Sequence, residues 1–236
     1  MRQSATKIRA VALYLGGMAD HDLRPVGVEG PELKTMADLL HEVFPTAHHF
    51  DPEVLRWQYR EDPAGAAVGF NAWQGDELAA HYVTIPMSAT VDGKPEKGLL
   101  SLNTATRPAH QGKGLFTKLA KATYELAAAQ GFGFVVGVAN ANSTHGFTKK
   151  LGFDLVSPLR AMIGIGALPV GDGTAEVRFA HAWDPASLAW RLRHPAYRYT
   201  QREQDGHTLV LSQRRQFGAR YVLGLRQGAV PEKVVE

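Results

Sequence analysis

The sequence predicts a mixed α/β fold in which helices cover a sheet. Two segments near the start carry apolar residues at helical spacing, and three consecutive segments between residues 66 and 106 have the character of strands. A helix, an apolar run, a short helix and a final apolar segment follow between residues 115 and 156. This order, two helices, three strands, then helix, strand, helix and strand, is typical of a layered α/β domain.

The first helix begins at Pro31 and ends before Pro45, and its apolar residues recur three or four positions apart. A second helix is predicted over residues 51–60, with Asp51 as the N-cap and Pro52 at the first helical position. The period then changes, which predicts strands over residues 66–73 and 78–90 around a turn at 74–77, and a third strand over 97–106.

The second half starts with a helix over residues 115–130, which Gly131 stops. Residues 132–138 form a nearly continuous apolar run, as expected of a strand that is covered on both faces. We predict a short helix over residues 143–151 and a strand that starts at Phe153.

The C-terminal part contains an internal similarity. Residues 184–193 match residues 51–60 at five of ten positions, and both are followed by a strand–turn–strand pattern, the second with Asp205-Gly206 at its turn. A repeated helix-plus-hairpin unit and a coincidence both explain these matches. A linker is expected at residues 169–173.

Composition excludes several functions. The chain has no cysteine, which rules out disulfides, thiolate nucleophiles, iron–sulfur clusters and cysteine-based zinc sites, and we expect no metal. No segment approaches the roughly 18 apolar residues of a membrane helix. Residues 10–15 weakly suggest a signal peptide, but Gly16-Gly17 interrupts them, so we expect a cytoplasmic protein without a membrane partner.

The net charge of +3 is unevenly distributed. Residues 184–226 hold eight arginines and three acidic residues, which gives 8 − 3 = +5 and leaves 3 − 5 = −2 for the remainder of the chain. A solvated arginine-rich face explains this tail. Contact with a phosphorylated acceptor or with nucleic acid is the alternative, although no nucleic-acid recognition motif occurs.

The segment that indicates a ligand lies at residues 106–116, between a strand and a helix. Gly112 and Gly114 allow the backbone to approach a ligand closely, and the N–H groups before a helix form a cradle for phosphate oxygens. Lys113 and Lys118 add positive charge. A plain strand-to-helix turn is the alternative. Neither the Walker loop nor the dinucleotide fingerprint fits the spacing of the glycines.

Gln111-Gly-Lys-Gly114-Leu-Phe116 resembles the phosphate loop of the GNAT superfamily of acyl-CoA N-acyltransferases, which reads Gln/Arg-x-x-Gly-x-Gly/Ala. Phe116 replaces the usual small residue. The segment 140–143 and Leu151-Gly152-Phe153 are similar to later features of the same superfamily. The resemblance covers about residues 24–166, which leaves an N-terminal extension (1–23) and a C-terminal arginine-rich extension (167–236).

The resemblance implies a splayed, mostly antiparallel sheet flanked by helices, with the helix-plus-hairpin unit as an extension. It implies N-acyl transfer, with acetyl-CoA or another acyl-CoA as co-substrate, to the amine of a small molecule by direct attack. Trp57 and Tyr59 suggest an amino sugar, and the protein would be a monomer or a homodimer. The implied acyl-CoA-binding residues are Leu102, Thr104, Thr106, Gln111, Gly112, Lys113, Gly114, Leu115, Phe116, Asn140 and Asn142.

Catalytic groups are expected among a few residues. Thr148 occupies the position where many superfamily members carry the tyrosine that acts as general acid and protonates the leaving thiolate. Ser143 is another candidate for this acid. His81, His110 and His145 are candidate bases, or else structural histidines. Ser101 and Asn103 share one face of a strand and would meet the acceptor. The absent tyrosine also leaves open an acyl-CoA-binding or regulatory module without turnover.

Overall fold

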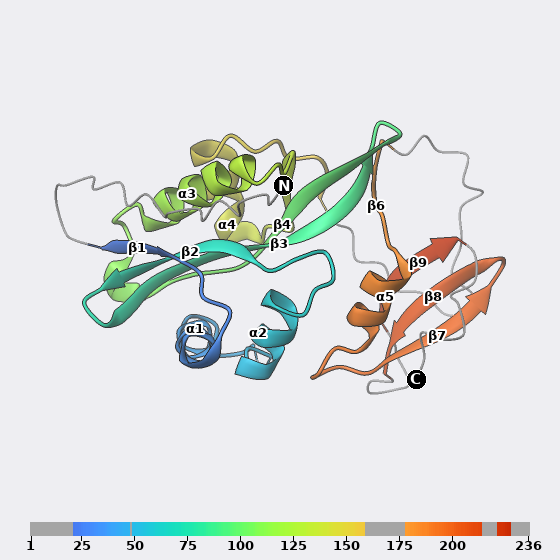
Figure 1. The fold of residues 1–236 in the computed structure, drawn as a ribbon, viewed down its shortest axis with the longest axis horizontal. Coiled ribbons are helices and arrows are strands. Elements are labelled where there is room, and N and C mark those ends of the chain that lie inside the picture. Colours follow the sequence, from blue (N-terminus) through green and yellow to red (C-terminus); the bar gives the residue numbers. More distant parts are fainter. Residues whose placement is uncertain (1–20, 48, 159–177, 214–220, 228–236) are drawn as a thin grey trace, which may run out of the picture.

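The computed structural model describes residues 21–47, 49–158, 178–213 and 221–227, and it confirms the mixed α/β fold (Figure 1). The main sheet has six strands: five run in the order β1-β2-β3-β4-β5, and β6 also pairs with β3. All pairs are antiparallel except β4–β5. The strands are β1 (Asp22–Pro25), β2 (Val68–Gln74), β3 (Glu77–Val91), β4 (Lys94–Thr106), β5 (Phe134–Gly137) and β6 (Phe179–His181).

Helices cover both faces of this sheet (Figure 1). On one face lie α1 (Gly30–Val43) and α2 (Pro52–Tyr59), whose buried leucines join Val83 and Ile85 of β3 in the largest core cluster. On the other face α3 (Leu115–Ala129) packs Leu115 and Leu119 against the alanines and Tyr82 of the sheet. The helical spacing of these apolar residues in the sequence therefore corresponds to the faces that are buried.

The segment after β5 differs from the prediction in part. It forms a short helix, α4 (Ala141–His145), which continues as one π-helical turn, η2 (Gly146–Lys150). The strand predicted from Phe153 is wrong, because residues 153–158 are irregular. The Phe153 N–H donates to the carbonyl of Phe147, and Phe153 packs against Tyr124 and Phe147 rather than beside β5.

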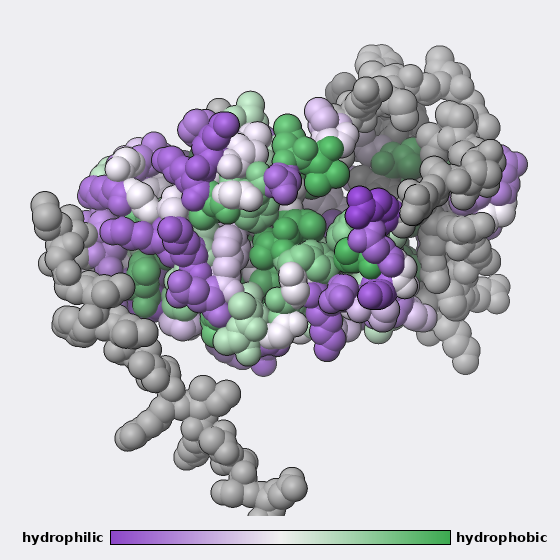
Figure 2. All heavy atoms as spheres, turned by 90° about the horizontal axis from the view of Figure 1, so that it is seen from above, coloured by the Kyte–Doolittle hydropathy of each residue, from purple (hydrophilic) through white to green (hydrophobic). Residues whose placement is uncertain are grey.

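Apolar surface remains where that strand was expected. Leu155 and Val156 are 65% and 96% exposed, and Val138 just after β5 is 73% exposed. Figure 2 looks onto the face that α3 covers, and hydrophobic residues gather near its middle. Among the described residues, no strand pairs with the outer edge of β5. The described helices include none that is long and apolar enough to span a membrane.

The C-terminal part forms α5 (Pro185–Leu192) and a separate antiparallel sheet of β7 (Tyr199–Gln204), β8 (His207–Ser212) and β9 (Val222–Gln227). The helix and hairpin predicted from the internal similarity are thus present, with the turn at Asp205-Gly206. The preceding β6 pairs with the end of β3, so this part also contributes a strand to the main sheet. The predicted linker at 169–173 lies outside the described residues.

Two equivalent tryptophans join α2 to α5. The rings of Trp57 and Trp190 stack with centroids 4.5 Å apart and an interplanar angle of 16°. The indole nitrogen of Trp57 donates to the carbonyl oxygen of Trp190 at 3.1 Å, and that of Trp190 donates to the carbonyl oxygen of Trp57 at 3.0 Å. Both side chains are about 95% buried. The two helices therefore contact each other symmetrically.

We predict that Trp190→Ala lowers the free energy of unfolding by about 3–5 kcal/mol, because a large buried ring and its hydrogen bond are lost. Trp183→Ala is the control, since Trp183 is partly exposed and stacks on His181. It should cost about 1 kcal/mol. Urea unfolding monitored by circular dichroism measures both values, and an equal loss in the two variants would contradict a central role for the tryptophan pair.

Candidate functional site

The site lies where β4 loses its parallel partner. The β4–β5 pairing runs from Gly98 opposite Phe134 to Ser101 opposite Gly137, and it stops there. The following residues of both segments, 101–104 and 137–140, line a cavity of about 290 Å³. Ser143 and Phe147 complete one wall, and Phe44, Thr46, Ala47 and Phe50, between α1 and α2, form another.

A β-bulge shapes the β4 wall of this cavity. Val83 stands opposite Leu102 and His81 opposite Ala105, so two residues of β4, Asn103 and Thr104, fall opposite Tyr82 alone. Asn103 takes a left-handed backbone conformation with φ of +47°. Asparagine tolerates this region better than most residues, and such a conformation persists where the surroundings fix it.

A chain of buried polar side chains starts at the bulge. The Nδ2 of Asn103 donates to the hydroxyl of Tyr59 at 2.9 Å and to Oε1 of Gln58 at 2.7 Å. The Tyr59 hydroxyl lies 3.1 Å from Nε2 of His81, whose Nδ1 lies 2.7 Å from Oδ1 of Asn71. Tyr59 and His81 are completely buried. Because burial disfavours the charged form, it lowers the pKa of His81 to about 3 and raises that of Tyr59.

A second set of hydroxyls extends from Ser101. Its Oγ lies 2.9 Å from the hydroxyl of Tyr82, which lies 2.6 Å from the hydroxyl of Tyr124 on α3. Burial raises the pKa of both tyrosines, so they stay protonated at neutral pH. Ser101 therefore points toward α3 and Asn103 toward α2, so the expectation that they share one face of the strand is wrong, because the bulge changes the alternation of side chains along β4.

The predicted phosphate loop follows β4 directly. A short 3₁₀-helix, η1 (Pro108–His110), comes first. Gly112 and Gly114 then have φ of +76° and +73°, and a Cβ at either position would meet open space. Backbone conformation, rather than packing, therefore requires glycine here. Gly114 precedes the first residue of α3, and no side chain caps that helix. Its first N–H groups lack partners within the helix and can bind an anion.

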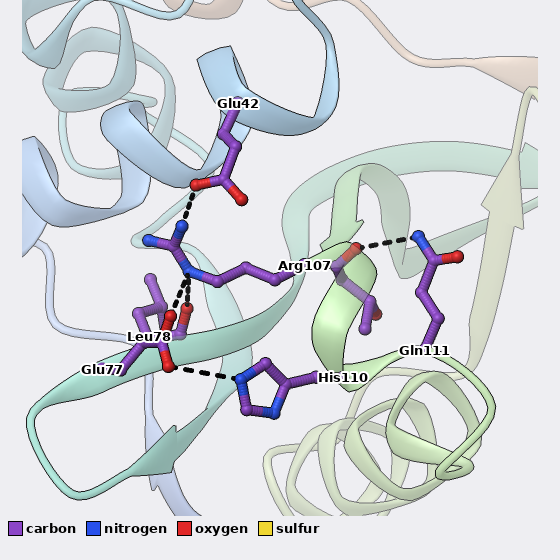
Figure 3. A network of polar contacts seen from close by, with 7 residues as sticks. Glu42, Glu77, Leu78, Arg107, His110 and Gln111 are labelled. Carbon is purple, nitrogen blue, oxygen red and sulfur yellow. Dashed lines mark hydrogen bonds and ion pairs between the residues drawn. The ribbon is translucent and has the colours of Figure 1, made fainter.

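Arg107 fixes the start of this loop (Figure 3). Its guanidinium pairs with Glu42 of α1, and its Nε donates to the carbonyl oxygen of Leu78 at 2.8 Å. His110 lies 3.3 Å from Glu77, the first residue of β3, and the Gln111 side chain donates to the carbonyl oxygen of Thr106. The loop is thus tied to α1 and to the β2–β3 turn.

The structure brings six of the predicted site residues together in the lining of the cavity. Ser101, Leu102, Asn103, Thr104, Asn140 and Ser143 line the cavity, and Thr106 ends β4 beside the loop residues 111–116. Asn142 lies in α4. The Oγ of Ser143 is hydrogen bonded to Asn140, which also lies in the cavity wall.

Other predicted residues lie elsewhere. Trp57 is in the core against Trp190, and His81 and Tyr59 are buried behind the cavity wall. His110 is also buried and faces Glu77. His145 is exposed at the end of α4 and does not line the cavity, and the Thr148 hydroxyl donates to the carbonyl oxygen of Thr144.

Sequence reasoning missed Asn71, Tyr82 and Tyr124, and it also missed the 44–50 segment as a cavity wall. The turn at 74–77 gives a hairpin register in which Asn71 would face Ala80. A bulge at Ala72/Trp73 shifts the pairing by one residue, so Asn71 faces His81 instead. No pattern in the sequence indicates this bulge.

A family model covers the residues that form the cavity and the glycine loop. Residues 28–156 match the family model of the acetyltransferase (GNAT) domain. No curated protein matches the chain. Similar solved structures include an acetyltransferase from Trypanosoma brucei (16% identity, TM-score 0.49) and glucosamine-6-phosphate N-acetyltransferase from Arabidopsis thaliana (14% identity, TM-score 0.48). Each similarity covers 61% of this chain and 99% of the other.

We predict that His81 stays neutral from pH 8 to pH 5, with its proton on Nδ1, as nitrogen NMR of the imidazole can show after assignment with His81→Gln. In the unfolded chain the imidazole of His81 takes up a second proton below its ordinary pKa of 6.5, whereas in the native protein burial lowers this pKa to about 3. The free energy of unfolding therefore falls by about 1.4 kcal/mol per pH unit below 6.5 from this group. A protonation midpoint near 6.5 in the native protein would refute the prediction.

Proposed function

The chain belongs to the acetyltransferase (GNAT) domain family and is an N-acetyltransferase, and we propose that it transfers the acetyl group of acetyl-CoA to the primary amine of a small molecule. The observation that carries the proposal is the continuity of one strand with two binding features. β4 lines the cavity through residues 101–104, ends at Thr106, and leads directly into the glycine loop and the uncapped start of α3.

An elongated thioester donor suits this arrangement. Its pyrophosphate would lie on the N–H groups of Gln111 to Phe116, with Lys113 adding positive charge. Its pantetheine arm would follow β4 past Thr106 and Thr104 to Leu102, and the thioester would enter the cavity at the bulge. Asn140 and Asn142 would border the donor from the side of α4.

The reaction needs no covalent enzyme intermediate. The amine nitrogen attacks the thioester carbonyl carbon, so a C–N bond forms and the C–S bond breaks. The amine loses a proton to a base or to solvent, and the departing thiolate takes up a proton. Without any cysteine, the chain cannot form an acyl-cysteine intermediate, which favours direct attack.

The proposed acid is Ser143, because it lines the cavity, whereas Thr148 is not among the lining residues. His145 is a candidate base that would accept the amine proton through solvent, since it is exposed. His81 does not suit this role, because it is buried and its pKa is about 3.

The acceptor is proposed to be a small amine such as an amino sugar. Its polar contacts would be Ser101 and Asn103, and Phe44 and Phe50 would cover its apolar side. Trp57 and Tyr59 would not touch it, since both are buried away from the cavity lining.

For the organisation of the chain we keep the proposed units 1–23, 24–166 and 167–236, in a monomer or homodimer. The proposal that the last unit repeats the helix-plus-hairpin unit is supported by α2 and α5. Each is an eight-residue helix that begins with proline after aspartate, and each precedes antiparallel strands.

We predict that Gly114→Ala weakens acetyl-CoA binding at least about 10-fold, because alanine disfavours the left-handed backbone that aims the N–H groups. Gly206→Ala is a matched control: its φ is also +73°, its Cβ would also meet open space, and it lies in the β7–β8 turn. Isothermal calorimetry with acetyl-CoA measures both affinities. Equal affinities in the two variants would argue against the loop as the pyrophosphate site.

We predict that the protein releases free thiol from acetyl-CoA in the presence of one or more members of a panel of amino sugars, aminoglycosides and polyamines. A thiol-reactive dye follows turnover, and mass spectrometry should find the acceptor heavier by one acetyl group. Binding of acetyl-CoA without turnover on the panel would favour a binding or regulatory module. Salt-dependent binding of mixed DNA, without acetyl-CoA binding, would favour the nucleic-acid alternative.

A further inference from the structure

The orientation of the Asn103 carboxamide is assigned from its hydrogen-bond partners. Its Nδ2 carries two hydrogens, and both are used: one in the bond to Oε1 of Gln58 and one in the bond to the hydroxyl of Tyr59. Among the described residues, Oδ1 has no partner. With the Gln58 carboxamide oriented as it is in the structure, a flipped Asn103 amide would place Oδ1 against Oε1 of Gln58, which has no hydrogen to donate. The network therefore leaves one acceptor atom available on a residue that lines the cavity.

The direction of the hydrogen bonds along the buried series Asn71, His81, Tyr59 and Asn103 supports this orientation. If Asn71 presents Oδ1 to His81, the Nδ1 of His81 is the donor and its Nε2 is an acceptor. The Tyr59 hydroxyl then donates to Nε2 and accepts from Asn103, and among the described residues Nδ2 of Asn71 is the buried side-chain atom left without a partner. The complete burial of Tyr59 and His81 keeps water from replacing either bond.

We propose that Oδ1 of Asn103 accepts a hydrogen bond from the N–H of the acceptor amine, and that Tyr59, His81 and Asn71 are positioning residues that hold this amide in the required orientation. This inference rests on the proposed acetyl transfer. A neutral oxygen suits a primary amine, because it binds one N–H without taking the proton and leaves the nitrogen lone pair to attack the thioester. The contact selects for acceptors that carry at least one N–H beside the reacting nitrogen lone pair.

The position on the bulge explains why this residue suits the role. Asn103 is the left-handed residue of the bulge, and it stands two positions beyond the end of the β4–β5 pairing. A carboxamide fixed there is at the cavity wall, and its direction is set by α2 rather than by solvent. Tyr59 in α2 and His81 in β3 therefore act on the acceptor through Asn103 without touching it.

Three variants test the proposal by steady-state kinetics with acetyl-CoA and the best amine of the panel. Asn103→Ala should lower kcat/KM for the amine about 10- to 100-fold, and Tyr59→Phe about 10-fold, since the amide loses its fixed orientation. The dissociation constant of acetyl-CoA should stay within about twofold of wild type in both. A merely structural role would not separate the two substrates in this way.

Thr84→Val is the matched control. Thr84 lies on β3 with His81, is completely buried, and its hydroxyl donates to the carbonyl oxygen of Val68. The variant loses a buried hydroxyl bond, as Tyr59→Phe does, but it leaves the chain to Asn103 intact. It should keep the wild-type kcat/KM for the amine, and thermal unfolding should show a comparable loss of stability in the two variants.

Each outcome decides the matter. If wild-type protein turns over an amine and Asn103→Ala keeps the same kcat/KM, the inference is overturned and the proposed function stands. A loss in Thr84→Val equal to that in Tyr59→Phe would also overturn it, since the effect would then be one of stability. If wild-type protein neither binds acetyl-CoA nor turns over any amine, the proposed function fails first and the inference fails with it.

Discussion

The organisation of this protein depends on how β4 is paired. One edge of the strand is bonded to β3 over nearly its whole length, but the other edge is bonded to β5 only as far as Ser101. The backbone beyond Ser101 therefore borders a cavity instead of another strand. Because β4 then runs into the glycine loop and α3, one strand positions the cavity and the glycine loop at a fixed spacing.

Burial around the cavity wall determines which chemistry each side chain can perform. Desolvation keeps His81 neutral and Tyr59 protonated, so these groups serve as hydrogen-bond partners and not as acids or bases near neutral pH. Groups that exchange protons must be sought among the residues that line the cavity, such as Ser143. The proposed direct transfer between a thioester and an amine depends on positioning, and the hydrogen-bonded side chains from Asn71 to Asn103 would provide it.

The C-terminal unit is attached through the same helix that supports Asn103. Gln58 and Tyr59 of α2 contact Asn103, while Trp57 of the same helix stacks on Trp190 of α5. The tryptophan pair faces the C-terminal unit, and the polar pair faces the cavity wall. The same helix, α2, therefore contacts both the C-terminal unit and the residue proposed to bind the acceptor.

The sequence by itself determined the helices, most of the strands, the glycine loop and the family resemblance, because apolar spacing and glycine placement act locally. It also indicated Ser101, Asn103, Asn140 and Ser143, since neighbours on one strand or turn share a location. It could not place His81, Tyr59 or Trp57, because two bulges and a contact between distant helices decide what those side chains face. A bulge moves the pairing by one residue and changes which side chains meet, so register and burial were decided only by the tertiary structure.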